Sequence, residues 1–160
     1  MTPAVVTLAH DLTVWRLVAE KHVSEAFSGE GARRYGGRWN RKGTAVVYTA
    51  ATRSLAILEM LVQADPLPKY MAVPATLPAG LRLAALSENS LPPDWRSMPL
   101  SESLRSLGGA WIAAGETCAL RVPSAVVPAE CNFLLNPAHP DLGKIRIGAP
   151  EPLSLDRRLL

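Results

Sequence analysis

Cysteine and histidine are scarce in this chain, and their scarcity excludes several kinds of site. The 160 residues include two cysteines, Cys118 and Cys131, and three histidines. Two cysteines are too few for a disulfide framework, and their spacing to each other or to the histidines fits no metal-ligand motif. No histidine has the context of a catalytic triad, which leaves a triad hydrolase with little support. We expect reduced cysteines in the core and no metal at the functional site.

Long apolar runs and blocks of like charge are also missing. No apolar segment reaches the roughly 20 residues that span a bilayer, and the first residues lack the basic start and apolar stretch of a secretory signal. We therefore expect a cytoplasmic protein with no membrane partner. Charged residues make up 19% of the chain, the net charge is +3, and both signs are mixed along it. This mixture argues against a disordered tail and against direct binding of nucleic acid by a basic arm.

The glycine patterns of nucleotide-binding α/β proteins are absent too. The glycines between positions 29 and 43 match neither the Rossmann nor the P-loop fingerprint. Strands are predicted at 13–18, 44–49, 70–77 and 118–122 and near 153–159, helices at 52–64 and 101–114, and a loop at 24–40. Because strands predominate and do not alternate regularly with helices, this order predicts one α+β domain over residues 1–160 with mainly antiparallel strands.

The helix predicted at 52–64, with Thr52 as its N-cap and Pro66 as its stop, carries an unusual acid. At 100° per residue, Leu55, Leu58 and Val62 share one face, and Glu59 lies beside Leu55 on the edge of that face. An acid in this position is partly buried. A desolvated carboxylate needs hydrogen-bond donors, so we expect Glu59 to find a partner in the fold or in a ligand.

A neighbouring arginine provides one such partner for Glu59. From geometry alone, an ion pair with Arg38 or Arg53 is as good an explanation as a functional role. Arg38 follows two glycines in the segment 35–40, where the backbone can turn tightly or approach a ligand. Its planar, permanently charged side chain suits phosphate. The alternative is an exposed loop arginine beside Trp39, which then closes the core.

Two further polar side chains accompany strands. Tyr48 stands inside the predicted strand 44–49, where its ring either belongs to the core or stacks on a heterocycle while its hydroxyl finds a polar partner. Ser124 directly follows Pro123 at the end of the predicted strand 118–122, a position from which loops present polar groups to a site. We do not interpret Ser124 as an activated nucleophile, because no histidine has a triad context.

Five short segments occur in a characteristic order. They are GRWN at 37–40, VVYTA at 46–50, SLAILEML at 54–61, VPS at 122–124 and NFLLNPAHPD at 132–141. Together they resemble the RES-domain family, which is named for an Arg, a Glu and a Ser, and the resemblance covers roughly residues 12–150. It implies a fold similar to that of ADP-ribosyltransferases, with mainly antiparallel strands in two packed sheets and a few helices. It also implies the toxin of a type II toxin–antitoxin module and an Xre-like antitoxin as its partner.

The resemblance further implies the substrate and the site. NAD⁺ is the implied substrate, with no permanently bound cofactor. Arg38, Glu59 and Ser124 match the three family residues, and Tyr48 matches a pocket tyrosine. Breaking the bond between nicotinamide and ribose builds oxocarbenium character at ribose C1, which a carboxylate such as Glu59 stabilises. The ADP-ribosyl group then passes to water or phosphate, which depletes NAD⁺, or to a protein.

Two other interpretations remain open in the sequence. A non-catalytic module that binds nucleic acid or a protein partner is compatible with the positive net charge and the four tryptophans. No basic stripe with interleaved aromatic residues supports it. Arg33 and Arg34, beside the glycine-rich segment, could contact an acidic part of the antitoxin, although exposed and solvated arginines are the default explanation.

Overall fold

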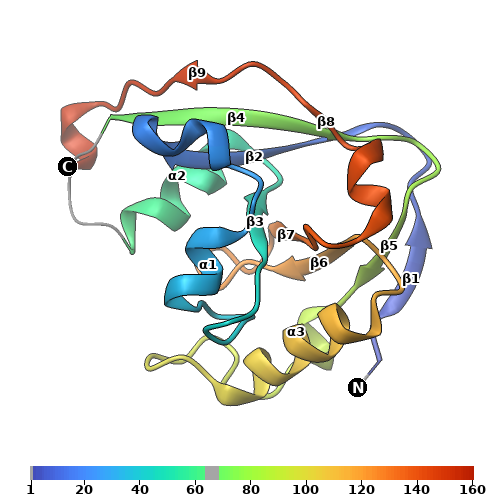
Figure 1. Ribbon diagram of the computed structural model, residues 1–160. Helices are drawn as coiled ribbons and strands as arrows, with labels where there is room; N and C mark the ends of the chain where they lie inside the picture. Colours follow the sequence, from blue (N-terminus) through green and yellow to red (C-terminus); the bar gives the residue numbers. More distant parts are fainter. Residues whose placement is uncertain (1, 64–68) are drawn as a thin grey trace.

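A computed structural model describes residues 2–63 and 69–160 of the chain, and strands dominate it (Figure 1). The strands are β1 (Ala4–Thr7), β2 (Leu12–Ala19), β3 (Val47–Ala50), β4 (Tyr70–Leu77), β5 (Arg82–Ala85), β6 (Ala119–Pro123), β7 (Cys131–Leu135), β8 (Arg146–Ile147) and β9 (Glu151–Pro152). The α-helices are α1 (Glu30–Tyr35), α2 (Arg53–Leu61) and α3 (Glu102–Ala114), and the 3₁₀ helices are η1 (Glu20–Glu25), η2 (Glu88–Ser90), η3 (Pro140–Lys144) and η4 (Arg157–Leu159). None of the described helices has the length and apolarity needed to cross a bilayer.

The predicted α+β class with mainly antiparallel strands is confirmed. Strand pairing follows the order β1-β5-β6-β7-β3-β2-β4-β8, with β9 on β4, and of the described pairs only β5 with β6 is parallel. The two packed layers are halves of one sheet: hydrogen bonds join all described strands into one path, and apolar side chains of β2 and β4 pack with those of β5, β6 and β7. The join is narrow: β2 and β3 pair only at Trp15 and Ala50. The strands diverge on either side of this pair, and the sheet therefore has two halves that part beside it.

The loop predicted at 24–40 is wrong, because this stretch holds the end of η1 and the whole of α1. Glycines flank the short helix on both sides. Gly29 precedes α1 with φ 74° and Gly36 ends it with φ 71°, in the left-handed region where a residue without Cβ is favoured. These two glycines therefore delimit a helix where the sequence analysis interpreted them as loop residues.

Other predicted elements shift by a few residues or fail. The strands at 70–77 and 118–122 and the helix at 101–114 correspond to β4, β6 and α3, while β3 begins at 47 and not at 44. Thr52 caps α2 as predicted, because its Oγ1 accepts a hydrogen bond from the Leu55 N–H at 3.0 Å. Ala64 and Pro66, the predicted end and stop, lie outside the described residues. The strand near 153–159 is wrong: a two-residue β9 precedes this stretch, which ends in η4.

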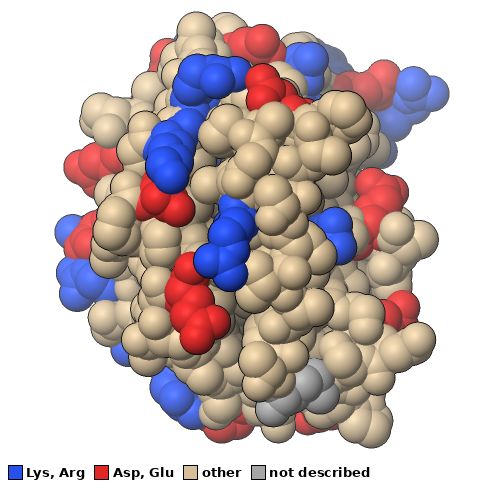
Figure 2. Space-filling view, turned by 90° about the vertical axis from the view of Figure 1, so that its right-hand side faces the viewer, with Lys and Arg blue, Asp and Glu red and all other residues tan. Residues whose placement is uncertain are grey.

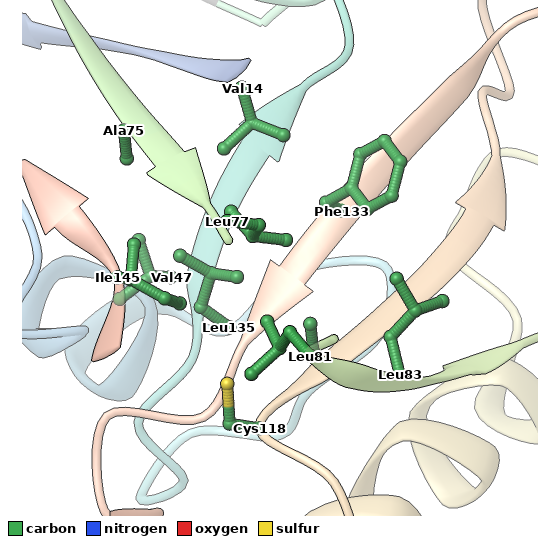
Figure 3. Close-up of a cluster of buried hydrophobic side chains, with 11 residues drawn as sticks. Val14, Val47, Ala75, Leu77, Leu81, Leu83, Cys118, Phe133, Leu135 and Ile145 are labelled. Carbon is green, nitrogen blue, oxygen red and sulfur yellow. The ribbon is translucent and has the colours of Figure 1, made fainter. Parts of the chain in front are cut away.

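Hydrophobic clusters lie on both faces of the part of the sheet that β5, β6 and β7 form. On one face, apolar side chains of β2, β3, β4 and β7, with the buried Cys118, point toward one another (Figure 3). On the other face, Leu104 and Trp111 of α3 pack against β5, β6 and β7. Because side chains alternate along a strand, β7 sends Phe133 and Leu135 to the first face and Asn132 and Leu134 to the second. Cys118 is the predicted reduced core cysteine, whereas the free Cys131 is half-buried.

Helix α2 contacts the sheet with a different face from the predicted one. Leu55 and Ala56 are its buried residues, whereas Leu58 is 40% exposed and Val62 63% exposed. Leu55 and Ala56 pack with Ala50 of β3, and the small alanines allow a close approach of helix and strand. Glu59 lies one turn after Leu55 and Ala56 on this inner side. It is therefore held against the sheet and not at the edge of an apolar stripe.

Candidate active site

A cavity of about 470 Å³ lies where β2 and β3 diverge, with α2 and the segment 31–39 around it. Its volume falls in the roughly 300–1,000 Å³ range of ligand pockets. Arg38, Tyr48 and Glu59, three of the four residues predicted for the site, line it. Arg16 and Asn132 line it too. The fourth predicted residue, Ser124, is fully buried and reaches the cavity through its bond to Glu59.

The carboxylate of Glu59 is held by neutral donors. Its Oε1 accepts hydrogen bonds from the Ser124 hydroxyl at 2.6 Å and from the Asn132 amide Nδ2 at 2.7 Å. Ser124 follows β6 and Asn132 lies on the adjacent β7, so neighbouring strands supply both donors. No described residue donates to Oε2. One oxygen of the carboxylate is therefore fixed by the fold, and the other is available to a ligand.

The ion pair of Glu59 with Arg38 or Arg53, one of the two alternatives left open by the sequence, does not form among the described residues. Arg53 instead pairs with Glu151 at 2.9 Å and lies 4.3 Å over the ring of Trp15. Arg38 binds carbonyl oxygens elsewhere. The partners of this partly buried acid are therefore the uncharged side chains of Ser124 and Asn132 and not an arginine.

Ser124 positions this carboxylate. Its hydroxyl oxygen accepts the backbone N–H groups of Val126 at 3.1 Å and Val127 at 3.0 Å, and its proton is directed to Glu59. With both acceptor sites of the oxygen engaged by the following turn, the hydroxyl has one orientation. This geometry agrees with the expectation that Ser124 is not a nucleophile.

Arg38 ties a distant segment to the pocket wall. Its Nη1 donates to the carbonyl oxygens of Trp95 at 2.9 Å and Ser97 at 3.4 Å, and its Nη2 lies 3.8 Å from Met98 Sδ. The side chain is half-buried, which lowers the pKa of its guanidinium, while the charge of Glu59 acts in the opposite direction. Arg38 thus adds positive charge beside the carboxylate without a direct ion pair, and it is not the freely exposed loop arginine of the alternative prediction.

Tyr48 holds the loop that carries Arg38. Its hydroxyl accepts the backbone N–H of Trp39 at 3.0 Å and donates to Asn40 Oδ1 at 2.7 Å. A Cβ on Gly37 would come within 2.8 Å of this hydroxyl, so the close approach requires glycine there. Because the hydroxyl is used inside the fold, the ring is the part of Tyr48 that meets the cavity.

Replacing Tyr48 with phenylalanine should lower stability at neutral pH and change its dependence on alkaline pH. Loss of the Tyr48 hydroxyl leaves the Trp39 N–H and Asn40 Oδ1 unpaired, which costs about 1–3 kcal/mol of unfolding free energy. Burial is the main cause that raises the pKa of Tyr48 well above its ordinary value. An unfolded tyrosine ionises near about pH 10, so this contribution is present below that pH and is lost as pH rises toward the folded pKa.

Urea denaturation at neutral pH and at several values above pH 10 measures both effects. The wild type should lose stability with rising pH more steeply than Tyr48→Phe. Tyr35, which is 77% exposed, offers the matched control, and Tyr35→Phe should follow the wild type throughout. Equal slopes in the wild type and Tyr48→Phe would show that the Tyr48 hydroxyl does not contribute as described.

Arg16 is a site residue that the sequence analysis missed. It lies on β2, its Nη1 donates to the Tyr48 carbonyl at 3.0 Å, and its buried Nε has no partner among the described residues. Burial lowers the pKa of its guanidinium. The sequence does contain a signal for Arg16, which is a charged residue between Trp15 and Leu17 inside the predicted strand 13–18. A buried charge is costly unless it meets a partner or a ligand.

Asn132 was likewise not assigned a role. It pairs with Ala50 across β3 and β7, which places its side chain at the cavity beside Glu59. It is the first residue of the segment 132–141, one of the five segments that resemble the RES-domain family, but no function was predicted for it. The sequence feature that could have indicated a role for Asn132 is a polar residue at the start of an apolar strand.

Surface charge is distributed without a dominant sign where the structure shows it. Arg33 and Arg34 of α1 both pair with Glu30 and are about half exposed or more. Hydrogen bonding to Arg33, then to Arg34, lowers the pKa of Glu30 to about 2. On the face in Figure 2, basic and acidic side chains are interspersed among uncharged ones. Neither observation favours the nucleic-acid-binding alternative.

Comparisons with known proteins agree on one family. The model of the RES domain matches residues 13–156. A protein of Sphingobium sp. (strain YBL2), called Prs ADP-ribosylating toxin, is 37% identical over 155 residues, which cover 91% of this chain and 95% of the relative. Toxin Res of Photorhabdus laumondii subsp. laumondii is 36% identical over 136 residues, covering 83% of this chain and 86% of the relative.

A solved structure shares the fold. It is the M. tuberculosis MbcT-MbcA toxin–antitoxin complex, which superposes with a TM-score of 0.72 and covers 92% of this chain and 87% of that chain. The sequence identity is 19%, so this likeness concerns the fold alone.

Proposed function

The chain belongs to the RES-domain family, and we propose that it is an enzymatic toxin that cleaves the nicotinamide–ribose bond of NAD⁺. One observation carries the proposal: the Glu59 carboxylate faces a cavity with one oxygen fixed by two neutral donors and the other open. Curated relatives named as toxins, one of them ADP-ribosylating, support it. We further propose that residues 1–160 act as a single domain of this type.

Glu59 has the position that the bond cleavage requires. As nicotinamide leaves, positive charge develops at ribose C1, and a fixed carboxylate close to the sugar stabilises that charge. The open oxygen also accepts a hydrogen bond from a ribose hydroxyl, which orients the sugar. Ser124 and Asn132 hold the carboxylate in place throughout. Nicotinamide departs as a neutral base, so the leaving group needs no proton.

Two arginines at the cavity suit the pyrophosphate of NAD⁺. Arg16 offers a buried Nε without a partner among the described residues, and Arg38, whose Nη1 is held by the Trp95 carbonyl, adds charge at the cavity. Charge-assisted hydrogen bonds from guanidinium groups to phosphate are strong and directional. The Tyr48 ring would then pack against nicotinamide or ribose, since its hydroxyl is already engaged.

The acceptor of the ADP-ribosyl group is water, phosphate or a protein. The name of the Sphingobium relative says that it ADP-ribosylates Prs, so Prs is the protein acceptor to test first. A small acceptor and a protein acceptor use the same pocket. They differ in what approaches ribose C1 from the open side of the cavity.

The test is incubation of the purified protein with NAD⁺ labelled in its adenosine part, alone, with phosphate, with purified Prs and with cell lysate. We expect release of nicotinamide, measured by chromatography. A labelled protein band identifies transfer to protein, and soluble ADP-ribose or its phosphate identifies a small acceptor. Absence of nicotinamide release in every mixture would reject the proposed function.

A protein that consumes NAD⁺ in the cytoplasm needs an inhibitor. The solved structure with the same fold is a toxin–antitoxin complex, and we propose an Xre-like antitoxin as the partner of this chain. Tyr35 lines the cavity and is 77% exposed, so a partner that covers Tyr35 would also close the entrance. The exposed ion pairs of Arg33 and Arg34 with Glu30 lie on the same short helix.

A further inference from the structure

Asn132 presents a hydrogen-bond acceptor that nothing in the described protein uses. Its Nδ2 donates to Glu59 Oε1 at 2.7 Å, while its buried Oδ1 has no donor among residues 2–63 and 69–160. Turning the amide over would place Oδ1 against the carboxylate oxygen, so the bond to Glu59 fixes its orientation. A buried acceptor without a donor lowers stability, and a ligand that brings a donor removes this cost.

The open oxygen of Glu59 is a second acceptor close by. Oε1 takes both protein donors, which leaves Oε2 without a described partner. Asn132 and Glu59 both line the cavity, and the hydrogen bond between Asn132 Nδ2 and Glu59 Oε1 holds the two remaining oxygens, Oδ1 and Oε2, in a fixed relation to each other. A carboxylate oxygen and an amide oxygen both accept hydrogen bonds and donate none. The complementary ligand group carries two neighbouring donors, as the adjacent hydroxyls of a ribose do.

We propose that Asn132 is a specificity-determining residue, whose side-chain carbonyl accepts one hydroxyl of the nicotinamide-bearing ribose while Glu59 accepts the other. The inference rests on the proposed function, and it identifies the hydroxyls of this ribose as the part of the substrate that Asn132 and Glu59 recognise. A site that leaves a buried polar group unpaired rejects an analogue strongly. The protein therefore distinguishes NAD⁺ from analogues in which this ribose lacks either hydroxyl.

The experiment combines protein variants with substrate analogues. The values of kcat/KM are measured for NAD⁺ and for its 2′-deoxy and 3′-deoxy forms at the nicotinamide ribose, using the wild type, Asn132→Ala and Ser124→Ala. Ser124→Ala is the matched control, because it removes the other donor to Glu59 Oε1 and leaves the Asn132 carbonyl in place. For variants that turn over too slowly, calorimetry measures the dissociation constants of NAD⁺ and of the two deoxy analogues. Circular dichroism checks that each variant is folded. Asn132→Ser serves if Asn132→Ala does not fold.

We expect the wild type and Ser124→Ala to lose about 10-fold or more for each missing hydroxyl. In Asn132→Ala, one of the two losses should disappear while the other persists. If both losses remain in Asn132→Ala, or if Ser124→Ala also abolishes one, Asn132 only orients Glu59 and the inference is overturned. If the wild type consumes none of the substrates, the proposed function itself fails and this inference falls with it.

Discussion

Replacing Glu59 with glutamine should reduce nicotinamide release from NAD⁺ by about 10²–10³-fold and leave the fold intact. Glutamine has the shape of glutamate and keeps one carbonyl oxygen, which can still accept the Ser124 hydroxyl and the Asn132 amide. It lacks the negative charge that opposes the charge developing at ribose C1. Because that charge exists mainly in the transition state, kcat should fall much more than KM rises.

Glu130 provides the control for this substitution. It is exposed in the turn between β6 and β7, and its side chain has no hydrogen bond among the described residues. Glu130→Gln removes the same charge and leaves the backbone bond from the Ser124 N–H to the Glu130 carbonyl in place. Steady-state rates of nicotinamide release, with urea denaturation of each variant, separate catalysis from folding. A Glu59→Gln protein that keeps the kcat of the wild type would show that the carboxylate charge is not part of the reaction.

Glu59 also shows how far the sequence predicts the site. Periodicity indicated a partly buried acid on the helix after Tyr48, and the structure has one. The sequence could not choose between an arginine and neutral donors as its partner, because Ser124 and Asn132 are 65 and 73 residues away along the chain. Apolar periodicity within a helix indicates whether a side chain is buried. The hydrogen-bond partners of that side chain depend on which strands become neighbours in the fold.

The face of α2 was misjudged for a related reason. Leu58 and Val62 are apolar, but both are exposed, and the small Ala56 is buried in their place. Apolar periodicity assumes that the largest side chains face the core. Where a helix approaches a strand closely and borders a cavity, size matters more than hydrophobicity. The inner face of α2 is therefore lined by Ala56 and Glu59.

Long strands and helices were predicted more reliably than short ones. The eight-residue β4 and the helix α3 were located within a residue or two, whereas β1 and β5, with four residues each, were missed. Four residues contain few alternations, and the equally short β3 was found because its segment is rich in β-branched and aromatic residues. Arg16 was missed for another reason, because its importance comes from the point where β2 parts from β3, beside the single pair of Trp15 and Ala50.

Alanine substitutions at the adjacent glycines of α3 should have opposite effects on stability. A Cβ on Gly108 would lie 2.8 Å from the Trp39 carbonyl carbon and closer still to its oxygen, and backbone atoms yield little. A Cβ on Gly109 would meet nothing within 4 Å. Gly108→Ala should therefore lower the free energy of unfolding by about 3 kcal/mol or more, as severe overpacking does. Gly109→Ala should raise it by up to about 1 kcal/mol, because alanine favours the helix.

The substitution at Gly108 should also reach the pocket. Trp39 follows Arg38, and its N–H binds the Tyr48 hydroxyl, while Arg105 of α3 donates to the Gly37 carbonyl at 3.2 Å. A displaced Trp39 therefore moves the loop that places Arg38 at the cavity. Urea denaturation should rank the proteins in the order Gly109→Ala, wild type, Gly108→Ala, and nicotinamide release by the folded fraction should fall only in Gly108→Ala. Similar stability changes in both variants would mean that α3 does not pack against the Trp39 backbone as described.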